Sequence, residues 1–387
     1  MAGDIYEQLL QMPRAQLVDI ALDGLSRQGE MIARVVECVR RQMGDLVGAA
    51  GAQRIYLAGC GDSYFAALSA RYAFERLTGI PTVALESMEL GRYTLLPPDS
   101  LVIVISSGGD VSATLEAGRV ARQAGVDVIG VTAQQGSRMA QEFPCLLTAP
   151  GPSGSDPVDQ VALVLGNFSL SFTALYLTAI HLGQNRGYLD DQAVEELEVE
   201  IRAVPNAIEL AMSCSSEIRE YLEGVSDEAD FYFLGAGPSH GVALFYQAKF
   251  FEQTQRPVYG VELEEFAHEQ FFLLRRGGDA QVWFIAPQGR SRERVQEIIT
   301  GCQEMGAHAI AVTNPHNGQI QENADLTFAV EATSEMFSPL ASVVPGELLG
   351  IHAFARWGSG PLSASERRRQ MAVSKRLTRK EGQGRTV

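Results

Sequence analysis

The sequence RIYLAGCGDSYFAA occupies residues 54–67 and contains the pattern that decides the fold. An apolar run of strand length ends in Gly-Cys-Gly and continues directly into residues that suit a helix. The same order recurs at residues 101–123, and another apolar run follows at residues 126–132. Short strands that alternate with helices form right-handed βαβ units, so we predict an α/β fold in which helices flank a parallel sheet.

The second half of the chain repeats this pattern. Gly61 and Ser63 fall opposite Gly237 and Ser239, and the run AGVDVIGVT falls opposite MGAHAIAVT, with offsets of 176 to 181 residues. Duplication of one α/β unit explains this agreement. A tandem of nucleotide-binding domains is the alternative, but neither half has G-x-G-x-x-G with an acidic residue about 20 positions later, nor a Walker lysine.

Five segments follow from the periodicity along the chain. Residues 1–50 keep apolar positions at helical spacing and are predicted to form an N-terminal helical arm. We place the first α/β domain at residues 51–186 and a helical connector at residues 187–225. The second α/β domain is placed at residues 226–360, and residues 361–387 form a C-terminal tail.

The composition narrows the class of protein. There are 47 acidic against 31 basic side chains, giving a net charge of −16, which is opposite to the charge of a nucleic-acid binder. The five cysteines are scattered and never form C-x-x-C, so we expect neither a disulfide framework nor a metal site. The N-terminus lacks signal-peptide features, and no apolar run reaches the length of a membrane span. We therefore expect a cytoplasmic protein without a nucleic-acid or membrane partner and without a cofactor.

Two loops of the first half are candidates for ligand binding. AGCGDSYFAA and ISSGGDVSAT each follow a strand and precede a helix, so both belong at the carboxyl edge of the sheet, where open α/β folds bind ligands. Their small residues allow backbone N–H groups to approach an anion. Alternatively, the serines are only helix N-caps. The candidate substrate-binding residues here are Cys60, Gly61, Asp62, Ser63, Ser106, Ser107, Gly108 and Ser112.

Two motifs of the second half supply candidate acid-base groups. AKFFE contains Lys249 and Glu252, and ELEEFAHEQ contains Glu265 and His268, sixteen residues after Glu252. With C-G-x-S and I-S-x-x-G-x-x-x-x-T in the first half, the chain from about residue 50 to 360 resembles the sugar isomerase (SIS) family. Within that family it resembles especially the isomerase half of glucosamine-6-phosphate synthase and the related fructosamine-6-phosphate deglycases.

The resemblance implies tandem SIS domains, each with a five-stranded parallel sheet, and a sugar phosphate held by Ser63 and Ser106. It also implies Glu252 as the catalytic base and His268 as the acid, with Lys249 and Glu265 contacting the substrate. Lys375, in the basic tail, is offered as the lysine that forms an imine with an open-chain sugar. A solvated terminus is the alternative reading of this tail.

Departures from the family pattern leave the substrate open. Asp62 replaces a hydroxyl residue and would repel a dianion unless protonated or paired, and Gly108 replaces another hydroxyl. The group at C6 of the sugar is then a phosphate, a sulfonate or absent. We expect an anionic 6-substituent, because two serine-containing loops remain at the sheet edge.

Acid-base chemistry explains the use of the Glu252 and His268 pair. Moving a proton between C1 and C2 of a sugar needs a base beside these carbons and an acid at the oxygen. Desolvation on an apolar helix would raise the pKa of Glu252 toward the range of a general base. The alternative is a solvent-facing Glu252 paired with Lys249, and a histidine that caps a helix.

We therefore expect an isomerase or deglycase that acts on an anionic ketose, aldose or fructosamine. A non-catalytic SIS sensor of sugar phosphates is the second hypothesis. The apolar N-terminal helices, and the family habit of sharing the histidine between subunits, lead us to expect a homodimer or a higher oligomer.

Overall fold

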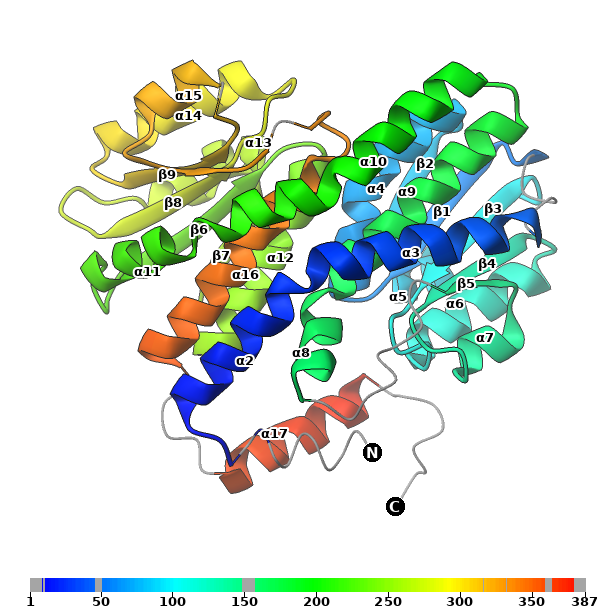
Figure 1. Cartoon of the computed structure of the whole chain (residues 1–387), viewed down its shortest axis with the longest axis horizontal. Helices are drawn as coiled ribbons and strands as arrows, with labels where there is room; N and C mark the ends of the chain where they lie inside the picture. Colours follow the sequence, from blue (N-terminus) through cyan, green and yellow to red (C-terminus); the bar gives the residue numbers. More distant parts are fainter. Residues whose placement is uncertain are drawn as a thin grey trace. The chain divides into compact units, whose positions relative to one another are not determined.

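The computed structural model describes residues 9, 11–45, 51–147, 157–315, 317–331, 333–358 and 364–378. The chain divides into two compact units. The first comprises residues 1–11, 30–199 and 361–387, and the second comprises residues 12–29 and 200–360. Each unit contains one five-stranded sheet whose strands are all parallel (Figure 1). The predicted duplicated α/β fold is confirmed.

The first unit has the strand order β2-β1-β3-β4-β5. Its strands are β1 (Arg54–Gly59), β2 (Thr82–Glu86), β3 (Ser100–Ile105), β4 (Asp127–Thr132) and β5 (Cys145–Leu147). The helices around them are α4 (Asp62–Thr78), α5 (Ser87–Tyr93), α6 (Ser112–Gln123), α7 (Arg138–Glu142), α8 (Pro157–Leu165) and α9 (Asn167–Asn185). The unit also includes α17 (Ala364–Leu377), most of α3 (Gln28–Gln42) and the short 3-10 turn η1 (Met43–Asp45).

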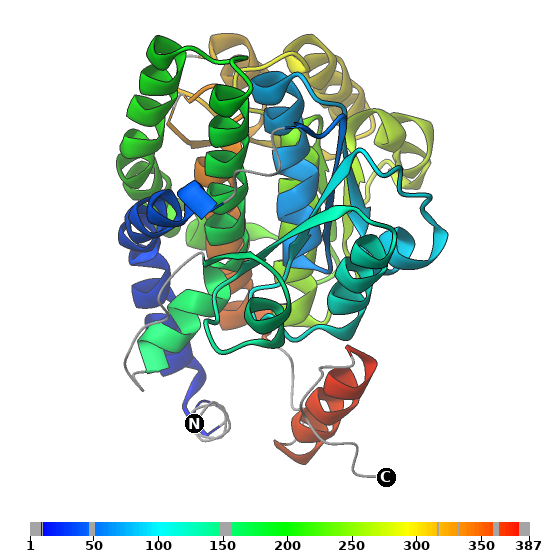
Figure 2. The same ribbon diagram turned by 90° about the vertical axis from the view of Figure 1, so that its right-hand side faces the viewer.

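Both faces of the first sheet are covered by helices. Side chains that alternate along β1 and β3, such as Tyr56 and Val102, pack against α5, α6 and α7. On the other face α4 and α9 pack against each other and contact the strands (Figure 2). Because both faces are buried, the strands are almost uninterrupted apolar runs, as expected for a parallel sheet.

The second unit has the strand order β10-β9-β8-β6-β7, which read from β7 is the order of the first sheet. Its strands are β6 (Asp230–Gly235), β7 (Tyr259–Glu262), β8 (Ala280–Ile285), β9 (His308–Thr313) and β10 (Leu326–Ala329). Its helices are α2 (Arg14–Ser26), α11 (Ser215–Gly224), α12 (Pro238–Thr254), α13 (Leu263–His268), α14 (Arg292–Glu304), α15 (Gly318–Asn323) and α16 (Ser338–Trp357), with the 3-10 turn η3 (Gln270–Leu273). Helix α10 (Asp191–Met212) contributes residues to both units.

The second sheet also has two different faces. Tyr232 and Leu234 of β6 point to the side covered by α13, α14 and α15. Phe233 and Trp283 point to the opposite side, where they meet Tyr246 of α12 in edge-to-face ring contacts. This alternation follows from the period of two residues in a strand.

The repeat extends to the backbone of the strand-to-helix turns. Gly61 has φ 55° and ψ −130°, and Gly237 has φ 55° and ψ −129°. Residues that carry a Cβ rarely adopt these backbone angles, so both turns depend on glycine. A Cβ at the preceding Gly59 would lie 2.7 Å from the backbone of Ser63, which explains the small residue at the strand end.

The predicted N-terminal helices are present, and α2 packs on α16 within the second unit. Gln28 Nε2 donates hydrogen bonds to both carboxylate oxygens of Glu347, at 3.3 and 3.2 Å. Both residues are buried. The buried Glu347 carboxylate therefore depends in part on a side chain far away in the sequence.

The described residues contain no single helix that is long and apolar enough to cross a membrane. The bent pair α8 and α9 reaches the required length and composition, at an angle of 55°. Most residues of α9 are buried in the first unit, as in a core helix.

Candidate functional site

The first sheet has a switch point between β1 and β3, where the chain connections leave in opposite directions. Open α/β sheets bind ligands in the crevice outside the carboxyl ends of such strands. The loops at residues 59–63 and 106–112 follow these two strands, so the structure brings both predicted loops to one sheet edge.

The two helices that leave this edge begin without side-chain caps. The N-cap of α4 is Gly61 and the N-cap of α6 is Val111, and neither makes a side-chain capping bond. The N-cap reading is therefore wrong for Ser63 and Ser112, which lie inside the first turns of these helices. Uncapped backbone N–H groups at a helix start suit an anion.

Ser63 and Ser106 are both buried at this edge. The Ser106 hydroxyl accepts a hydrogen bond from the backbone N–H of Gly109 at 3.1 Å, which leaves its own proton to donate. The Ser63 hydroxyl makes no hydrogen bond to another described residue. The Ser107 carbonyl is occupied, because it accepts from Ala133 N at 3.0 Å and from Thr132 Oγ1 at 3.1 Å.

Cys60 belongs to a small polar network beneath the turn. Its Sγ donates to Glu86 Oε1 at 3.0 Å and lies 3.7 Å from Thr114 Oγ1, which also contacts Ser87 Oγ at 3.0 Å. Burial, and then the hydrogen bond to Glu86, raises the pKa of the Cys60 thiol. Cys60 therefore acts as a neutral donor that connects the loop to β2, rather than as a thiolate.

Sequence reasoning missed Glu86, Ser87 and Thr114. One signal was available, because Glu86 and Glu262 are 176 residues apart, like Gly61 and Gly237. In the structure each caps the helix that follows: Glu86 accepts from Met88 N at 2.7 Å, and Glu262 accepts from Glu264 N at 2.8 Å.

Asp62 and Gly108 represent the departures from the family pattern. Asp62 is the first residue of α4 and is partly exposed, a place where the helix dipole favours a carboxylate. Gly108 is exposed, and nothing lies within 4 Å of the position its Cβ would take. The loop therefore has open space at the position where the resemblance implies a hydroxyl side chain.

In the second unit Lys249 and Glu252 form an ion pair on α12, with 3.0 Å between Lys249 Nζ and Glu252 Oε2. Lys249 is only 7% exposed, and its Nζ lies 5.1 Å from the centre of the Phe245 ring. The Glu252 side chain is 51% exposed. The desolvation predicted for this carboxylate is therefore not found, and the alternative reading of a solvent-facing, paired glutamate describes the single chain.

His268 is the last residue of α13, and its side chain is 68% exposed. Its Nε2 lies 3.2 Å from Glu264 Oε1, and Glu264 also receives Arg294 Nε at 2.7 Å. The Arg294 guanidinium holds the pKa of the Glu264 carboxyl below its usual value. Glu265 is exposed, and its backbone N–H donates to Glu262 Oε2 at 3.2 Å.

The topology separates Glu252 from His268 within one chain. Helix α12 starts beyond the carboxyl end of β6 and runs back along the sheet for 17 residues, about 25 Å at 1.5 Å per residue. Glu252 near its end therefore lies toward the amino edge, whereas His268 follows the carboxyl end of β7. One chain presents the two groups at opposite edges of the second sheet.

Lys375 lies on α17, but its side chain is outside the described residues. Over the part of the chain that the structure describes, no three His, Cys, Asp or Glu side chains gather into a group that would hold a metal ion.

Comparison with known proteins places these features in a family. The family model named SIS domain matches residues 50–180 and 225–356. A glutamine–fructose-6-phosphate aminotransferase [isomerizing] from Thermococcus kodakarensis is 28% identical over 93% of this chain and 56% of its own length. The chain thus spans about half the length of the curated relatives it matches.

Solved structures share the fold. The C-terminal domain of glucosamine-fructose-6-phosphate aminotransferase from Francisella tularensis has a TM-score of 0.77 at 19% identity, over 87% of this chain and 95% of that domain. Tagatose-6-phosphate ketose/aldose isomerase from Escherichia coli has a TM-score of 0.68 at 14% identity, over 90% and 96% of the two chains. The family model matches both halves of the chain, and the two halves share one strand order and the same backbone angles at Gly61 and Gly237. The chain therefore belongs to the SIS domain family.

Proposed function

We propose that this protein is a sugar isomerase or deglycase that acts on an anionic ketose, aldose or fructosamine, with a phosphate or sulfonate at C6. The observation that carries the proposal is the pair of loops that meet at the β1/β3 switch point. The N-cap residues of α4 and α6 make no side-chain capping bond there. Ser63 lies in the first turn of α4, Ser106 directly follows β3, and both residues are buried. Hydroxyls and backbone N–H groups together suit an anionic oxygen.

In the proposed reaction, the Glu252 carboxylate removes a proton from the carbon beside the sugar carbonyl, and an enediolate forms. The same group returns the proton to the neighbouring carbon while the hydroxyl proton moves from one oxygen to the other, which exchanges aldose and ketose. His268 supplies the proton that opens the sugar ring. Lys249 Nζ lies 3.0 Å from Glu252 Oε2 and places a positive charge beside the proposed base.

The names of the relatives support this class of chemistry. The curated relatives are isomerising aminotransferases of fructose 6-phosphate, and the neighbouring folds include a ketose/aldose isomerase. By the same resemblance, we propose that Lys375 supplies the amine for an imine intermediate and that the protein works in the cytoplasm.

We expect 6-phosphorylated or 6-sulfonated sugars to raise the melting temperature more than the uncharged parent sugars. At 100 times Kd the added stability is about 2.7 kcal/mol, or about 5–10 °C for a domain of this size. A thermal-shift panel of free, phosphorylated, sulfonated and amino-acid-conjugated sugars measures this, with Ser63→Ala as the variant that weakens the shift. A shift from uncharged sugars only would contradict the anionic pocket.

A sensor of sugar phosphates would show the same thermal shift without turnover. Incubation of each sugar in deuterated water, followed by NMR at C1 and C2, separates the two functions. Exchange of the C2 proton catalysed by the protein supports the enzyme. Binding without exchange or product would establish the sensor instead.

We also propose a homodimer or higher oligomer, because one chain presents Glu252 and His268 at opposite edges of the second sheet. Light scattering at micromolar concentration is expected to show a mass at least twice the 41.9 kDa of one chain.

Mixing inactive Glu252→Gln with inactive His268→Asn should restore activity. After random subunit exchange about half of the dimers are mixed, and each mixed dimer carries one intact Glu252 and His268 pair, so about a quarter of all sites should be active. A monomer, or no restored activity after subunit exchange, would contradict shared sites.

A further inference from the structure

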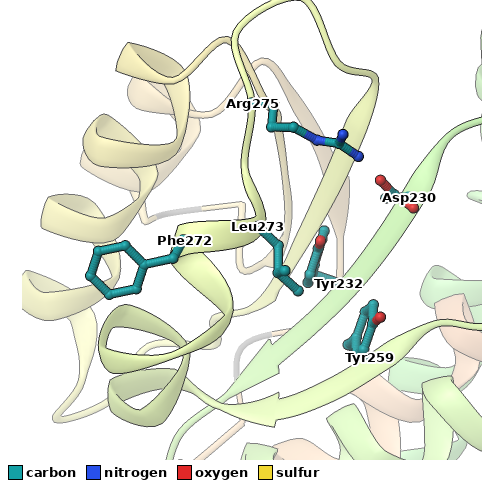
Figure 3. Close-up of a pocket in the computed structure, with 6 residues that line it drawn as sticks. All are labelled: Asp230, Tyr232, Tyr259, Phe272, Leu273 and Arg275. Carbon is teal, nitrogen blue, oxygen red and sulfur yellow. The ribbon is translucent and has the colours of Figure 1, made fainter.

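The second unit contains a pocket that none of the proposed catalytic or substrate-binding residues lines. It encloses about 260 Å³ and is lined by Asp230, Tyr232, Tyr259, Phe272, Leu273 and Arg275 (Figure 3). Asp230 and Tyr259 are the first residues of β6 and β7, so the pocket is at the amino edge of the sheet. This is the edge opposite to the one where α/β folds usually bind ligands.

The pocket is also on the other face of the sheet from Glu252. Tyr232 belongs to the cluster that packs against α13 and α14, whereas α12 covers the opposite face. Neither Lys249 nor Glu252 lines the pocket. A ligand bound here is therefore separate from the proposed acid-base chemistry of the same chain.

Two tyrosines form the floor of the pocket. Tyr232 and Tyr259 are direct neighbours in the strand register, and their rings stack with centroids 5.2 Å apart and an angle of 14°. Tyr232 is buried, but Tyr259 remains 40% exposed, and Leu273 beside them is 48% exposed. An apolar or aromatic group can lie against Tyr259 and Leu273. Phe272 borders the pocket, with its ring turned away from the tyrosines (Figure 3).

Opposite charges face each other at one end of this floor. Figure 3 shows the guanidinium of Arg275 and the carboxylate of Asp230 directed toward one another, yet they form no ion pair within 4 Å. The position of Arg275 is set by a turn in which its carbonyl accepts from Gly278 N at 2.9 Å. Burial raises the pKa of Tyr232 to about 12; Asp230 adds to the rise and Arg275 opposes it, so both charges act on this hydroxyl.

We propose that this pocket binds a free α-amino acid with an apolar or aromatic side chain. Its ammonium group would meet Asp230, and its carboxylate would meet Arg275, because an α-amino acid carries both charges on one carbon. Its side chain would lie on Tyr259 and Leu273. The cavity is smaller than the roughly 300–1,000 Å³ of sites for drug-sized ligands, which suits a small molecule. A phosphate would be repelled by Asp230, and a neutral sugar would leave both charges unpaired.

The test uses L-phenylalanine as the probe and reads binding, by calorimetry and ligand-observed NMR, rather than turnover. We expect saturable binding that Arg275→Ala and Asp230→Asn each weaken about tenfold or more, since hydrogen bonds to charged groups are lost. N-Acetyl-L-phenylalanine and L-phenylalaninamide each lack one of the two charges. Their binding to the wild type should be as weak as the binding of L-phenylalanine to the two variants. Arg276→Ala is the matched control, because Arg276 is next to Arg275 in the sequence and is exposed but does not line the pocket.

Two outcomes would overturn the proposal: no saturable binding up to tens of millimolar, or equal binding by Arg275→Ala and the wild type. Both substitutions are on exposed side chains, and an unchanged melting temperature will show that the variants fold. Glu252→Gln should bind the probe normally. A failure here therefore leaves the proposed isomerase untouched, and a failure of the isomerase leaves this pocket untouched.

Discussion

Glu252→Gln is expected to reduce kcat by about 10²–10³-fold while the protein stays folded. The substitution nearly conserves the shape of the side chain but removes the group that accepts the proton. The amide oxygen can still accept a hydrogen bond from Lys249 Nζ, which now lies 3.0 Å from the carboxylate. The melting temperature should therefore change little, and the loss should appear in kcat more than in KM.

The measurement uses the sugar with the greatest turnover in the panel and compares Glu252→Gln with Glu304→Gln. Glu304 is an exposed glutamate at the end of α14, so its substitution removes the same charge without touching the proposed site. A rate for Glu252→Gln equal to that of the wild type would refute the assignment of the base.

Gly109→Ala is expected to destabilise the protein by about 2–5 kcal/mol, the sum of backbone strain and steric overlap. Gly109 has φ 69°, and a Cβ there would lie 2.2 Å from Ser137 Oγ. The same residue donates its N–H to Ser106 and accepts from Met139 N at 3.0 Å. The loop cannot move without breaking the turn that positions the Ser106 hydroxyl.

The adjacent Gly108→Ala provides the control. Gly108 has open space around the position of the added methyl group. The free energy of unfolding of Gly108→Ala should therefore lie within about 1 kcal/mol of the wild-type value, as is usual for surface substitutions. Denaturant unfolding measures the free energy of unfolding of both variants. A thermal-shift assay with inorganic phosphate tests whether the loop of each folded variant still binds an anion. Equal stability of the two variants would show that the loop tolerates rearrangement.

Much of the fold was predictable from local patterns. The apolar run at residues 54–59 and the glycines beside it have only one economical arrangement, a strand that turns sharply into a helix. The repeat was visible because both turns need glycine at the same backbone angles, φ 55° at Gly61 and at Gly237. Such constraints act within a few residues, so the sequence displays them directly.

The candidate site was predictable only in part. The serine loops could be placed at one sheet edge, but the contact of Cys60 with Glu86 depends on β2 lying beside β1. The pocket at Tyr232 and Tyr259 depends on the register of β6 and β7. The exposure of Glu252 depends on what covers the end of α12, which an apolar helical period does not specify.

The hydrogen bonds between Gln28 and Glu347 impose an order on folding. The two residues are 319 positions apart, whereas the first sheet is complete in sequence by residue 147. At 5–20 residues per second, α2 waits roughly 15–65 s on the ribosome for the helix that it covers. During that time the first sheet and its helices can fold, but Gln28 has no carboxylate to meet and α2 exposes its apolar face. Newly made chains therefore pass through a stage in which the first sheet can form while the second unit is open, when crowded copies can pair wrongly.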